Sequence, residues 1–132
     1  MINIGIVGCG NWAIRIIDEI NCNKHFNLTS IVCRKKNKTS NLKVFDSIEA
    51  MINSNINDSI YVAAYPDTNL EVIKLLNKKN IPVILEKPTT SSLKNIEELK
   101  IIANNNKLII YPNLTNYFSE TYLELKEIVK EN

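Results

Sequence analysis

The first 13 residues restrict the fold of this chain more than any other part, because an apolar strand runs straight into a glycine-rich turn. Ile2–Val7 predict a buried strand, and Asn11–Cys22 have the apolar spacing of a helix. The turn between them reads Gly8-Cys9-Gly10-Asn11-Trp12-Ala13, which fits the pattern G-x-G-x-x-A. Strand, turn and helix in immediate succession are the context in which this motif binds a dinucleotide, and we expect such a unit here.

The small residues of the motif have separate physical roles. Gly8 permits the tight turn, Gly10 lets the backbone approach a pyrophosphate, and Ala13 lets the helix pack against the strand. Free amides at the start of the helix would face the phosphates, with Asn11 as the expected cap. Glycines also make plain turns, so a purely structural turn remains the alternative.

Short apolar runs alternate with helical patterns along the rest of the chain. Further strands are predicted at Leu28–Cys33, Val44–Phe45, Ser59–Ala64, Pro82–Leu85 and Lys107–Tyr111. Helices are predicted near Ser92–Asn104 and Ser119–Lys130, and after two capping-box patterns, Asp46–Glu49 and Thr68–Glu71. This rhythm predicts an α/β fold, a Rossmann-like doubly wound parallel sheet of about six strands, with residues 1–132 as a single domain.

Composition excludes several classes of function. The 132 residues are 45% hydrophobic and 23% charged, as in a soluble globular protein. The net charge of +2 is too small to indicate binding to nucleic acid or to a membrane surface. No apolar run approaches the roughly 20 residues that a bilayer requires. The first residues also lack the pattern of a signal peptide, so we expect a cytoplasmic protein.

Three cysteines are scattered along the chain without paired spacing: Cys9, Cys22 and Cys33. An odd and sparse set is more typical of reduced thiols in a cytosolic protein than of disulfides or a zinc site. We therefore expect neither a disulfide nor a metal centre.

The end of the second predicted strand bears on the choice of cofactor. An acidic residue about 20 positions after the glycines would bind the ribose of NAD, but this chain has Cys33-Arg34-Lys35-Lys36 there. An arginine pairs well with a 2′-phosphate through its planar guanidinium. This pattern favours NADP over NAD, with a solvated basic loop as the alternative.

The strand at Val83-Ile84-Leu85 ends in Glu86-Lys87-Pro88, which is unusual for a turn. Ligands of open parallel sheets bind outside the carboxyl ends of the strands. A partly desolvated lysine in that place can exchange protons near neutral pH. We therefore interpret Lys87 as a candidate catalytic residue, and the alternative is a surface lysine that pairs with Glu86.

Together these segments resemble the N-terminal domain of the glucose–fructose oxidoreductase/inositol dehydrogenase (Gfo/Idh/MocA) family. The resemblance rests on the glycine motif, on Tyr65-Pro66-Asp67-Thr68-Asn69 and on Glu86-Lys87-Pro88. It implies hydride transfer between a nicotinamide and a sugar or polyol carbinol, with Lys87 assisting proton movement and a cis Lys87–Pro88 bond. The cofactor-binding residues that we expect are Gly8, Gly10, Asn11, Trp12, Ala13, Cys33, Arg34, Lys35, Tyr65, Pro66, Asn69, Glu86, Lys87 and Asn113.

The chain also departs from the family pattern. Many members carry His at the position of Asn69, and relatives often place an Arg in the stretch that here reads Asn113–Tyr117. Relatives continue into a second α/β domain that carries the substrate pocket, whereas this sequence ends at Asn132. Two alternatives therefore stay open: a binding-only cofactor domain that acts as a sensor or subunit, and a truncated, inactive relative.

The final predicted helix carries an apolar stripe. Tyr122, Leu125, Ile128 and Val129 recur at three- and four-residue spacing. If the stripe is exposed, we expect a homodimer or a complex with a second chain that covers it. The alternative is that the stripe packs on the domain's own sheet.

Overall fold

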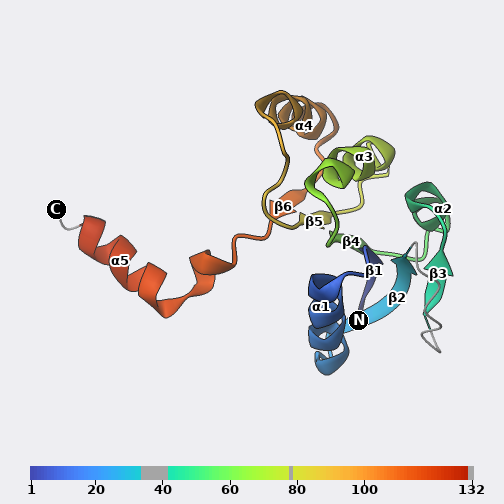
Figure 1. The fold of residues 1–132 in the computed structure, drawn as a ribbon, viewed down its shortest axis with the longest axis horizontal. Helices are drawn as coiled ribbons and strands as arrows, with labels where there is room; N and C mark the ends of the chain where they lie inside the picture. The colour runs from blue at the N-terminus through green and yellow to red at the C-terminus, as the bar shows by residue number, and fades with distance from the viewer. Residues whose placement is uncertain (34–41, 78, 131–132) are drawn as a thin grey trace.

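Six parallel strands form one sheet, as the alternating pattern predicts (Figure 1). The structure is a computed structural model that describes residues 1–33, 42–77 and 79–130. The strand order is β3-β2-β1-β4-β5-β6, and every neighbouring pair is parallel. The strands are β1 (Ile2–Val7), β2 (Phe26–Val32), β3 (Lys43–Phe45), β4 (Ser59–Val62), β5 (Val83–Leu85) and β6 (Ile110–Pro112). This topology confirms the predicted Rossmann-like fold.

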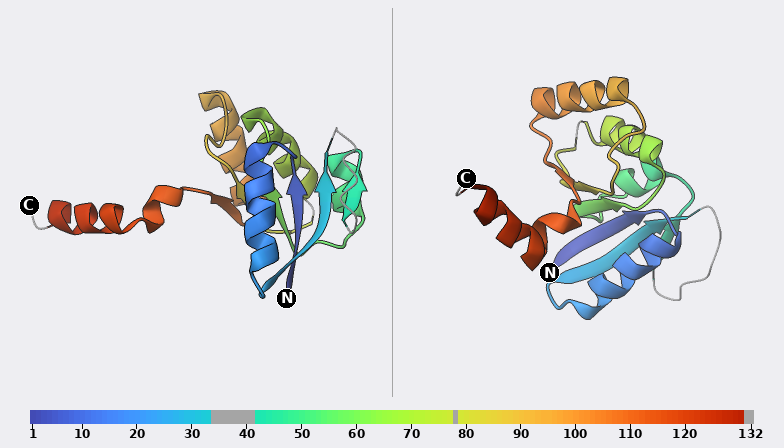
Figure 2. Two further views of the ribbon diagram at one scale, coloured as in Figure 1. Left: turned by 60° about the horizontal axis from the view of Figure 1, so that its bottom comes forward. Right: turned by 60° about the vertical axis from the view of Figure 1, so that its left-hand side comes forward.

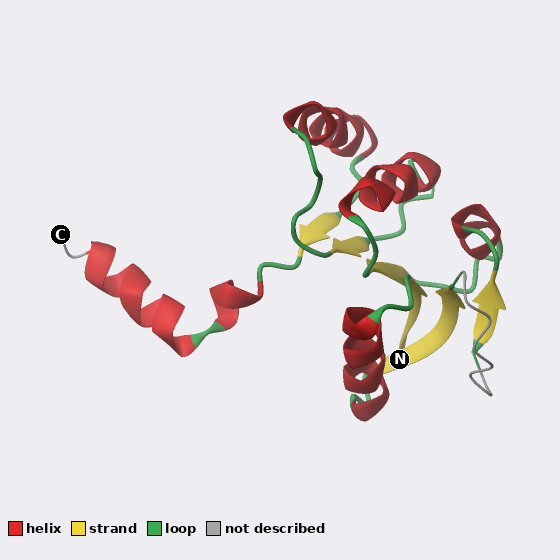
Figure 3. Cartoon of the chain, viewed as in Figure 1, coloured by secondary structure: helices red, strands yellow, loops and turns green. Residues whose placement is uncertain are grey.

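Helices follow the strands, as expected for βαβ units (Figure 3). They are α1 (Asn11–Cys22), α2 (Ile48–Asn53), α3 (Pro66–Leu76), α4 (Leu93–Asn106) and α5 (Glu120–Lys130). A short 3₁₀ helix, η1 (Thr115–Phe118), was not predicted from the sequence. Among the described residues, no helix is long and apolar enough to cross a membrane.

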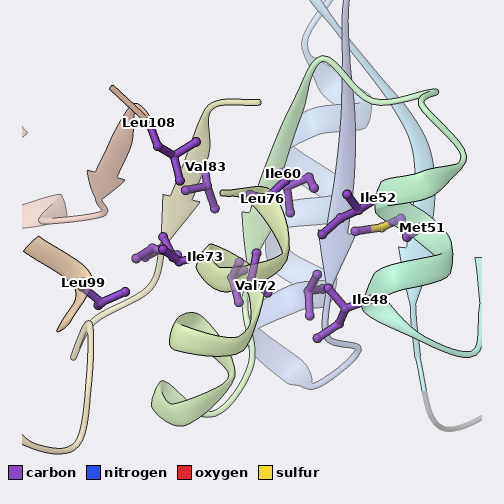
Figure 4. Packing of buried hydrophobic residues seen from close by; sticks show 13 residues of the cluster. Ile48, Met51, Ile52, Ile60, Val72, Ile73, Leu76, Val83, Leu99 and Leu108 are labelled. Atoms are coloured by element: carbon purple, nitrogen blue, oxygen red, sulfur yellow. The ribbon is translucent and has the colours of Figure 1, made fainter. Parts of the chain in front are cut away.

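The main core lies between the sheet and helices α2, α3 and α4 (Figure 4). Alternate residues of a strand point to opposite faces, so Ile60 and Val62 of β4 enter this core while Tyr61 points to the other side. The fully buried side chains that meet there include Met51, Ile73, Leu76 and Leu85. This packing fixes the strands whose carboxyl ends carry the candidate site.

Helix α1 covers the opposite face of β1 and β2. Its Ala13 and Ile20 are buried against Ile4, Ile6 and Ile31. Beyond α1, toward β4 and β5, this face forms an open apolar cleft of about 620 Å³. Ile2, Ile16, Phe26 and Ile84 are among the residues that line it.

The helix starts only partly follow the predicted capping boxes. Ser47 caps α2 by accepting a hydrogen bond from the Ala50 amide at 3.1 Å, one residue later than the box at Asp46 predicts. The box at Thr68–Glu71 is wrong as a helix start, because α3 already begins at Pro66. A proline has no amide hydrogen and a fixed φ, so it suits the first turn of a helix.

Helix α5 extends away from the sheet and from the other helices (Figures 1 and 2). None of its residues is buried, and its main neighbour is η1, where the rings of Tyr117 and Tyr122 lie 4.7 Å apart. The side chains of Leu125 and Val129 are 54% and 72% exposed. The alternative that this stripe packs on the domain's own sheet is therefore wrong.

Candidate functional site

One row of the sheet brings the candidate site together. The last paired residues of the six strands are in register: Phe45, Val32, Val7, Val62, Leu85 and Pro112. The residues that follow this row along the carboxyl edge are Asp46, Cys33, Gly8, Ala63, Glu86 and Asn113. Four of these six were predicted as site residues from the sequence. The strand pairing therefore brings residues that are up to 105 positions apart in the sequence to one edge of the sheet.

A cleft of about 890 Å³ opens at this edge. It lies where β1 separates β2 from β4, which is the point of a doubly wound sheet at which ligands bind. Its lining residues include the glycine turn, the end of β2 and the start of α3: Val7, Gly8, Cys9, Gly10, Val32, Asp46, Ser47, Ile48, Ala63, Ala64, Tyr65, Thr68 and Glu71.

The two glycines of the turn behave differently. Gly8 has a φ of +118°, and a Cβ there would lie 2.2 Å from the Ala63 carbonyl oxygen, so no other residue fits. Its amide donates a hydrogen bond to the Val32 carbonyl at 3.0 Å. A Cβ on Gly10 would meet nothing within 4 Å, which leaves the backbone open to a ligand. This geometry fits the roles expected of a tight turn and a close approach.

The start of α1 has amides without a side-chain acceptor. Gly10 is the N-cap and supplies no side chain, so the expectation that Asn11 caps the helix is wrong. Asn11 is instead the first helical residue, and no acidic residue occupies the first turn. Unpaired amides and the helix dipole favour an anion at this place. The turn and the helix therefore offer a site that suits a pyrophosphate.

A disulfide joins Cys9 to Cys33, so the prediction of reduced thiols at these two positions is wrong. The physical reason is strand pairing: β1 and β2 end side by side, with Val7 opposite Val32. The residues just beyond the two strand ends are therefore close, and the Cα atoms of Cys9 and Cys33 lie 5.5 Å apart. Their separation of 24 residues gave no hint of this. Cys22 is free and exposed.

A buried carboxylate lies at the end of β5. Glu86 is only 9% exposed, and its Oε1 accepts hydrogen bonds from the Tyr61 hydroxyl and from Asn113 Nδ2, the latter at 2.7 Å. Asn113 Nδ2 also lies 2.7 Å from the Tyr61 hydroxyl oxygen, and the Lys87 amide donates to Glu86 Oε2 at 3.2 Å. The Trp12 side chain also acts on Glu86 and lowers the pKa of its carboxyl group. Burying a charge is costly unless it is hydrogen-bonded, and this network meets that requirement.

The network keeps Glu86 ionised. Burial raises the pKa of Glu86, but the hydrogen bonds from Tyr61, Asn113, Trp12 and the Lys87 amide outweigh it and leave the pKa below the ordinary value of 4.5. Burial and the neighbouring Glu86 carboxylate raise the pKa of the Tyr61 hydroxyl well above its ordinary value. Tyr61 therefore stays protonated as a donor, and Glu86 stays charged as an acceptor.

Lys87 itself is exposed next to this network. The Lys87–Pro88 bond is cis, which confirms the prediction from the family resemblance. The ion pairs of the described residues are Lys74–Glu98 and Lys130–Glu127, so the alternative that Lys87 pairs with Glu86 is wrong for this part of the chain. Its ammonium group is thus exposed at the edge of the sheet without a fixed carboxylate among the described residues.

Asn69 has a different surrounding from the one expected of a cofactor ligand. It is 1% exposed in α3, and its Nδ2 donates to the Thr89 carbonyl at 2.8 Å. Through this hydrogen bond it fixes the segment after Pro88, and it does not line the cleft.

Of the remaining predicted residues that the structure describes, Tyr65 lines the cleft, and Pro66 and Trp12 do not. Tyr65 is 85% exposed and lines the cleft, and Pro66 starts α3. Trp12 is 42% exposed, with the Arg15 guanidinium 5.9 Å from its ring centroid. Arg34 and Lys35 lie outside the described residues.

The residues of the site that sequence reasoning missed include three with ionisable side chains: Tyr61, Asp46 and Glu71. Tyr61 is a tyrosine in an otherwise aliphatic strand, which is a weak signal for a buried hydrogen bond. Asp46 and Glu71 line the cleft, but in the sequence both looked like helix-capping residues. The register of the sheet, which places Asp46 beside Cys33, was the missing information.

Comparison with known proteins agrees with this geometry. Residues 2–114 match the Gfo/Idh/MocA oxidoreductase family with an NAD-binding Rossmann fold. Among curated proteins, the uncharacterized oxidoreductase YgjR of Escherichia coli (strain K12) is 24% identical over 119 residues, which are 84% of this chain and 36% of YgjR. The family resemblance inferred from the sequence is thereby confirmed.

Solved structures show the same fold at low sequence identity. The scyllo-inositol dehydrogenase of Lactobacillus casei, solved with bound NAD(H) and scyllo-inositol, superposes with a TM-score of 0.90 at 19% identity, covering 99% of this chain and 41% of the dehydrogenase. A mutant of KijD10, a 3-ketoreductase from Actinomadura kijaniata solved with TDP-benzene and NADP, gives 0.82 at 19% identity, covering 98% and 44%. This chain therefore spans about two fifths of the length of these proteins.

The lowered pKa of Glu86 predicts how stability depends on pH. A carboxylate whose pKa is lower in the folded state contributes stability above its unfolded-state pKa, and loses it as the pH falls through the folded-state pKa. We expect Glu86→Gln to destabilise the fold at neutral pH, and the difference from the unsubstituted protein to shrink at pH values below 4.5. Urea unfolding at several pH values measures it, with Glu124→Gln on exposed α5 as the control. A difference that stays constant with pH would show that Glu86 is not held as a carboxylate.

Proposed function

This chain belongs to the Gfo/Idh/MocA family of oxidoreductases, and we propose that it binds NADP, or NAD as the alternative, along the carboxyl edge of its sheet. On this proposal residues 1–132 are one dinucleotide-binding domain. The observation that carries the proposal is the glycine turn, where Gly8 admits no side chain and Gly10 leaves the approach to α1 open. We further propose that the domain takes part in hydride transfer between the nicotinamide and a sugar or polyol carbinol.

The site fits a dinucleotide in separate parts. The amides of the turn and of the first turn of α1 would hold the pyrophosphate. The row at the ends of β2 and β3 would hold the adenosine ribose, with Arg34 and Lys35 for a 2′-phosphate. The ends of β5 and β6 would face the nicotinamide. A bound nicotinamide supplies or accepts the hydride, which no side chain can do.

Lys87 is the proposed catalytic residue. It is exposed at the end of β5, between a hydrogen-bonded Glu86 and a Thr89 that Asn69 holds in place. With this backbone held, the ammonium group can donate a proton to, or accept one from, a carbinol oxygen. Glu86 would then be a positioning residue, since its oxygens are already bonded to Tyr61, Asn113 and the Lys87 amide.

A binding-only domain, acting as a sensor or subunit, is the second candidate. The observation that favours it is the content of the carboxyl edge at β5 and β6. There the polar groups of Glu86 and Asn113 are bonded to each other, so neither is available to exchange a proton with a substrate, and catalysis at this edge would depend on Lys87. Such a domain would bind the dinucleotide and lack turnover.

Cofactor preference is the first prediction. We expect NADP(H) to bind more tightly than NAD(H). Arg34→Ala should weaken the binding of NADP(H) by roughly tenfold, since a charge-assisted hydrogen bond is worth about 1.5–3 kcal/mol. The affinity for NAD(H) should stay unchanged. Asp46 and Glu71 on the cleft wall oppose an added phosphate, so the preference should be modest. Calorimetric titration is the measurement.

Two further variants separate the outcomes of that titration. Lys126→Ala on exposed α5 is the matched control for loss of one positive charge. Gly10→Val should abolish binding of both cofactors by filling the open approach to α1. Equal affinities for NADP(H) and NAD(H) would overturn the NADP assignment alone, while no binding of either would overturn the proposed function.

The role of Lys87 is tested by comparing binding with turnover. We expect Lys87→Met to bind the dinucleotide within about twofold of the unsubstituted protein and to lose roughly 10²–10⁴-fold in turnover, the usual worth of a positioned acid or base. Nicotinamide absorbance with a panel of sugars and polyols, inositols included, reports turnover, and Lys94→Met, also exposed, is the control. Absence of turnover in the unsubstituted protein, with binding intact, would favour the binding-only domain.

We also propose that α5 mediates assembly with a second copy of this chain. Its apolar residues Leu123, Leu125 and Val129 are exposed, Leu123 at 50%, and so is Phe118 of the adjacent η1, at 69%. The open apolar cleft beside α1 is a second uncovered surface of the same domain. Contiguous apolar surface of this kind is uncommon on monomers.

Light scattering across a concentration range tests this assembly. We expect a dimer that dissociates on dilution, and Val129→Glu should shift the equilibrium to monomer without lowering the melting temperature, because Val129 is 72% exposed in the single chain. Glu124→Gln on the same helix is the control. A monomer at every concentration would contradict the proposal.

A further inference from the structure

We propose that the Cys9–Cys33 pair is a reversible redox site, at which a dithiol reductant opens the disulfide and thereby weakens dinucleotide binding. Cys9 lines the cleft, and its disulfide to Cys33 joins the glycine turn to the end of β2. The effect on binding rests on the proposed function, while the modification site itself rests on the disulfide and its position.

Cys9 is the residue that can anchor this turn. Gly8 and Gly10 flank it and have no side chains, so Cys9 carries the one side chain of residues 8–10 that can attach the turn to a neighbouring element. The disulfide uses that side chain to fix the turn to Cys33, across a Cα distance of 5.5 Å. The peptide groups on either side of Cys9 are the ones that a pyrophosphate would approach.

Opening the disulfide should loosen the turn without unfolding it. The hydrogen bond from the Gly8 amide to the Val32 carbonyl, at 3.0 Å, remains when the sulfur atoms separate. Beyond Gly8, however, a Cβ on Gly10 would meet nothing within 4 Å, so no packing at that position replaces the lost anchor. The Gly10 carbonyl is bonded only within the start of α1, by the Ile14 amide at 3.1 Å. The reduced turn must then be ordered when a ligand binds, which costs affinity.

The exposure of the two cysteines determines which sulfur atom a reductant attacks. Cys33 is 8% exposed, whereas Cys9 is partly exposed and lines the cleft. A thiolate of the dithiol therefore attacks Sγ of Cys9. The Cys9–Cys33 bond breaks, a mixed disulfide forms on Cys9, and Cys33 leaves as a thiolate that takes up a proton.

The second thiol of the reductant completes the exchange. This second thiol attacks the reductant's other sulfur, the one bonded to Cys9 in the mixed disulfide. Cys9 is released as a thiolate and takes up a second proton. Two electrons and two protons pass from the dithiol to the protein, and the reductant ends as a disulfide. Exchange with an oxidised dithiol runs the same steps backwards.

The predicted compartment fits a reversible bond. Disulfides are uncommon in cytosolic proteins, and those that occur there are usually transient and redox-active. On the cytoplasmic location that the sequence predicts, a lasting structural disulfide would be unusual. A bond that opens in response to dithiols is consistent with that environment.

The experiment compares the full chain in two redox states, with dithiothreitol as reductant and its cyclic disulfide as oxidant. Iodoacetamide labelling after denaturation counts thiols, and we expect one label, on Cys22, in the oxidised protein and three in the reduced protein. Calorimetry should show dinucleotide binding weakened roughly three- to tenfold by reduction, the cost of ordering one or two flexible groups. Hydrogen exchange should be faster at residues 8–14 in the reduced state.

Three variants make the result specific. Cys9→Ser and Cys33→Ser should each match the reduced protein in affinity and in hydrogen exchange, and lose their response to dithiothreitol. Cys22→Ser removes the cysteine that is free in this structure and should respond as the unsubstituted protein does.

The outcomes separate this proposal from the proposed function. Three labels under oxidising conditions, or equal dinucleotide affinity in the two states, would overturn the redox proposal. If neither state binds a dinucleotide, the proposed function fails. Hydrogen exchange at residues 8–14 then decides: a difference between the two states supports the modification site, and identical exchange overturns it.

Discussion

The pairing of β1 with β2 on one side and β4 on the other is the constraint on which the site depends. Val7 lies opposite Val32 and Val62 in one row, so the next residues of all three strands meet at one edge. Gly8 then lies against the Ala63 carbonyl, where a Cβ would be 2.2 Å from the oxygen. A larger residue at this position would force β1 and β4 apart. The turn, the disulfide and the cleft would then no longer be held in fixed positions relative to one another.

The carboxyl edge is chemically divided along the strand order. Around β1 the polar groups are backbone amides, which favour an anion. At β5 and β6 they belong to a buried carboxylate, whose lone pairs are taken by Tyr61, Asn113 and the Lys87 amide. Because the charged Glu86 carboxylate is stabilised by hydrogen-bond donors rather than by an ion pair, the ammonium group of Lys87 has no fixed carboxylate partner among the described residues and can act toward solvent or a ligand. The two halves suit the two ends of a dinucleotide.

Local patterns were enough to predict the sheet, most strand positions and the glycine turn, because these depend on apolar periodicity and on backbone freedom. They failed where contacts join distant residues. The Cys9–Cys33 bond and the place of Asp46 in the cleft both follow from register between neighbouring strands, which no single segment encodes. The start of α3 at Pro66, rather than at the capping box of Thr68, shows that a fixed φ can outweigh a capping pattern.

Asn69 is a buried residue that fixes the main chain next to an exposed one. Its Nδ2 holds the Thr89 carbonyl from within the domain, while Glu86 Oε2 accepts from the Lys87 amide on the other side of Pro88. The backbone of Lys87 is therefore fixed both before and after it, although its side chain is exposed. Fixing the main chain this way reduces the entropy lost when the side chain engages a ligand, and the flexible aliphatic stem of Lys87 would then reach the carbinol oxygen of the proposed reaction. A buried amide on one side of Pro88 and a buried carboxylate on the other are thus enough to fix the backbone of an exposed lysine.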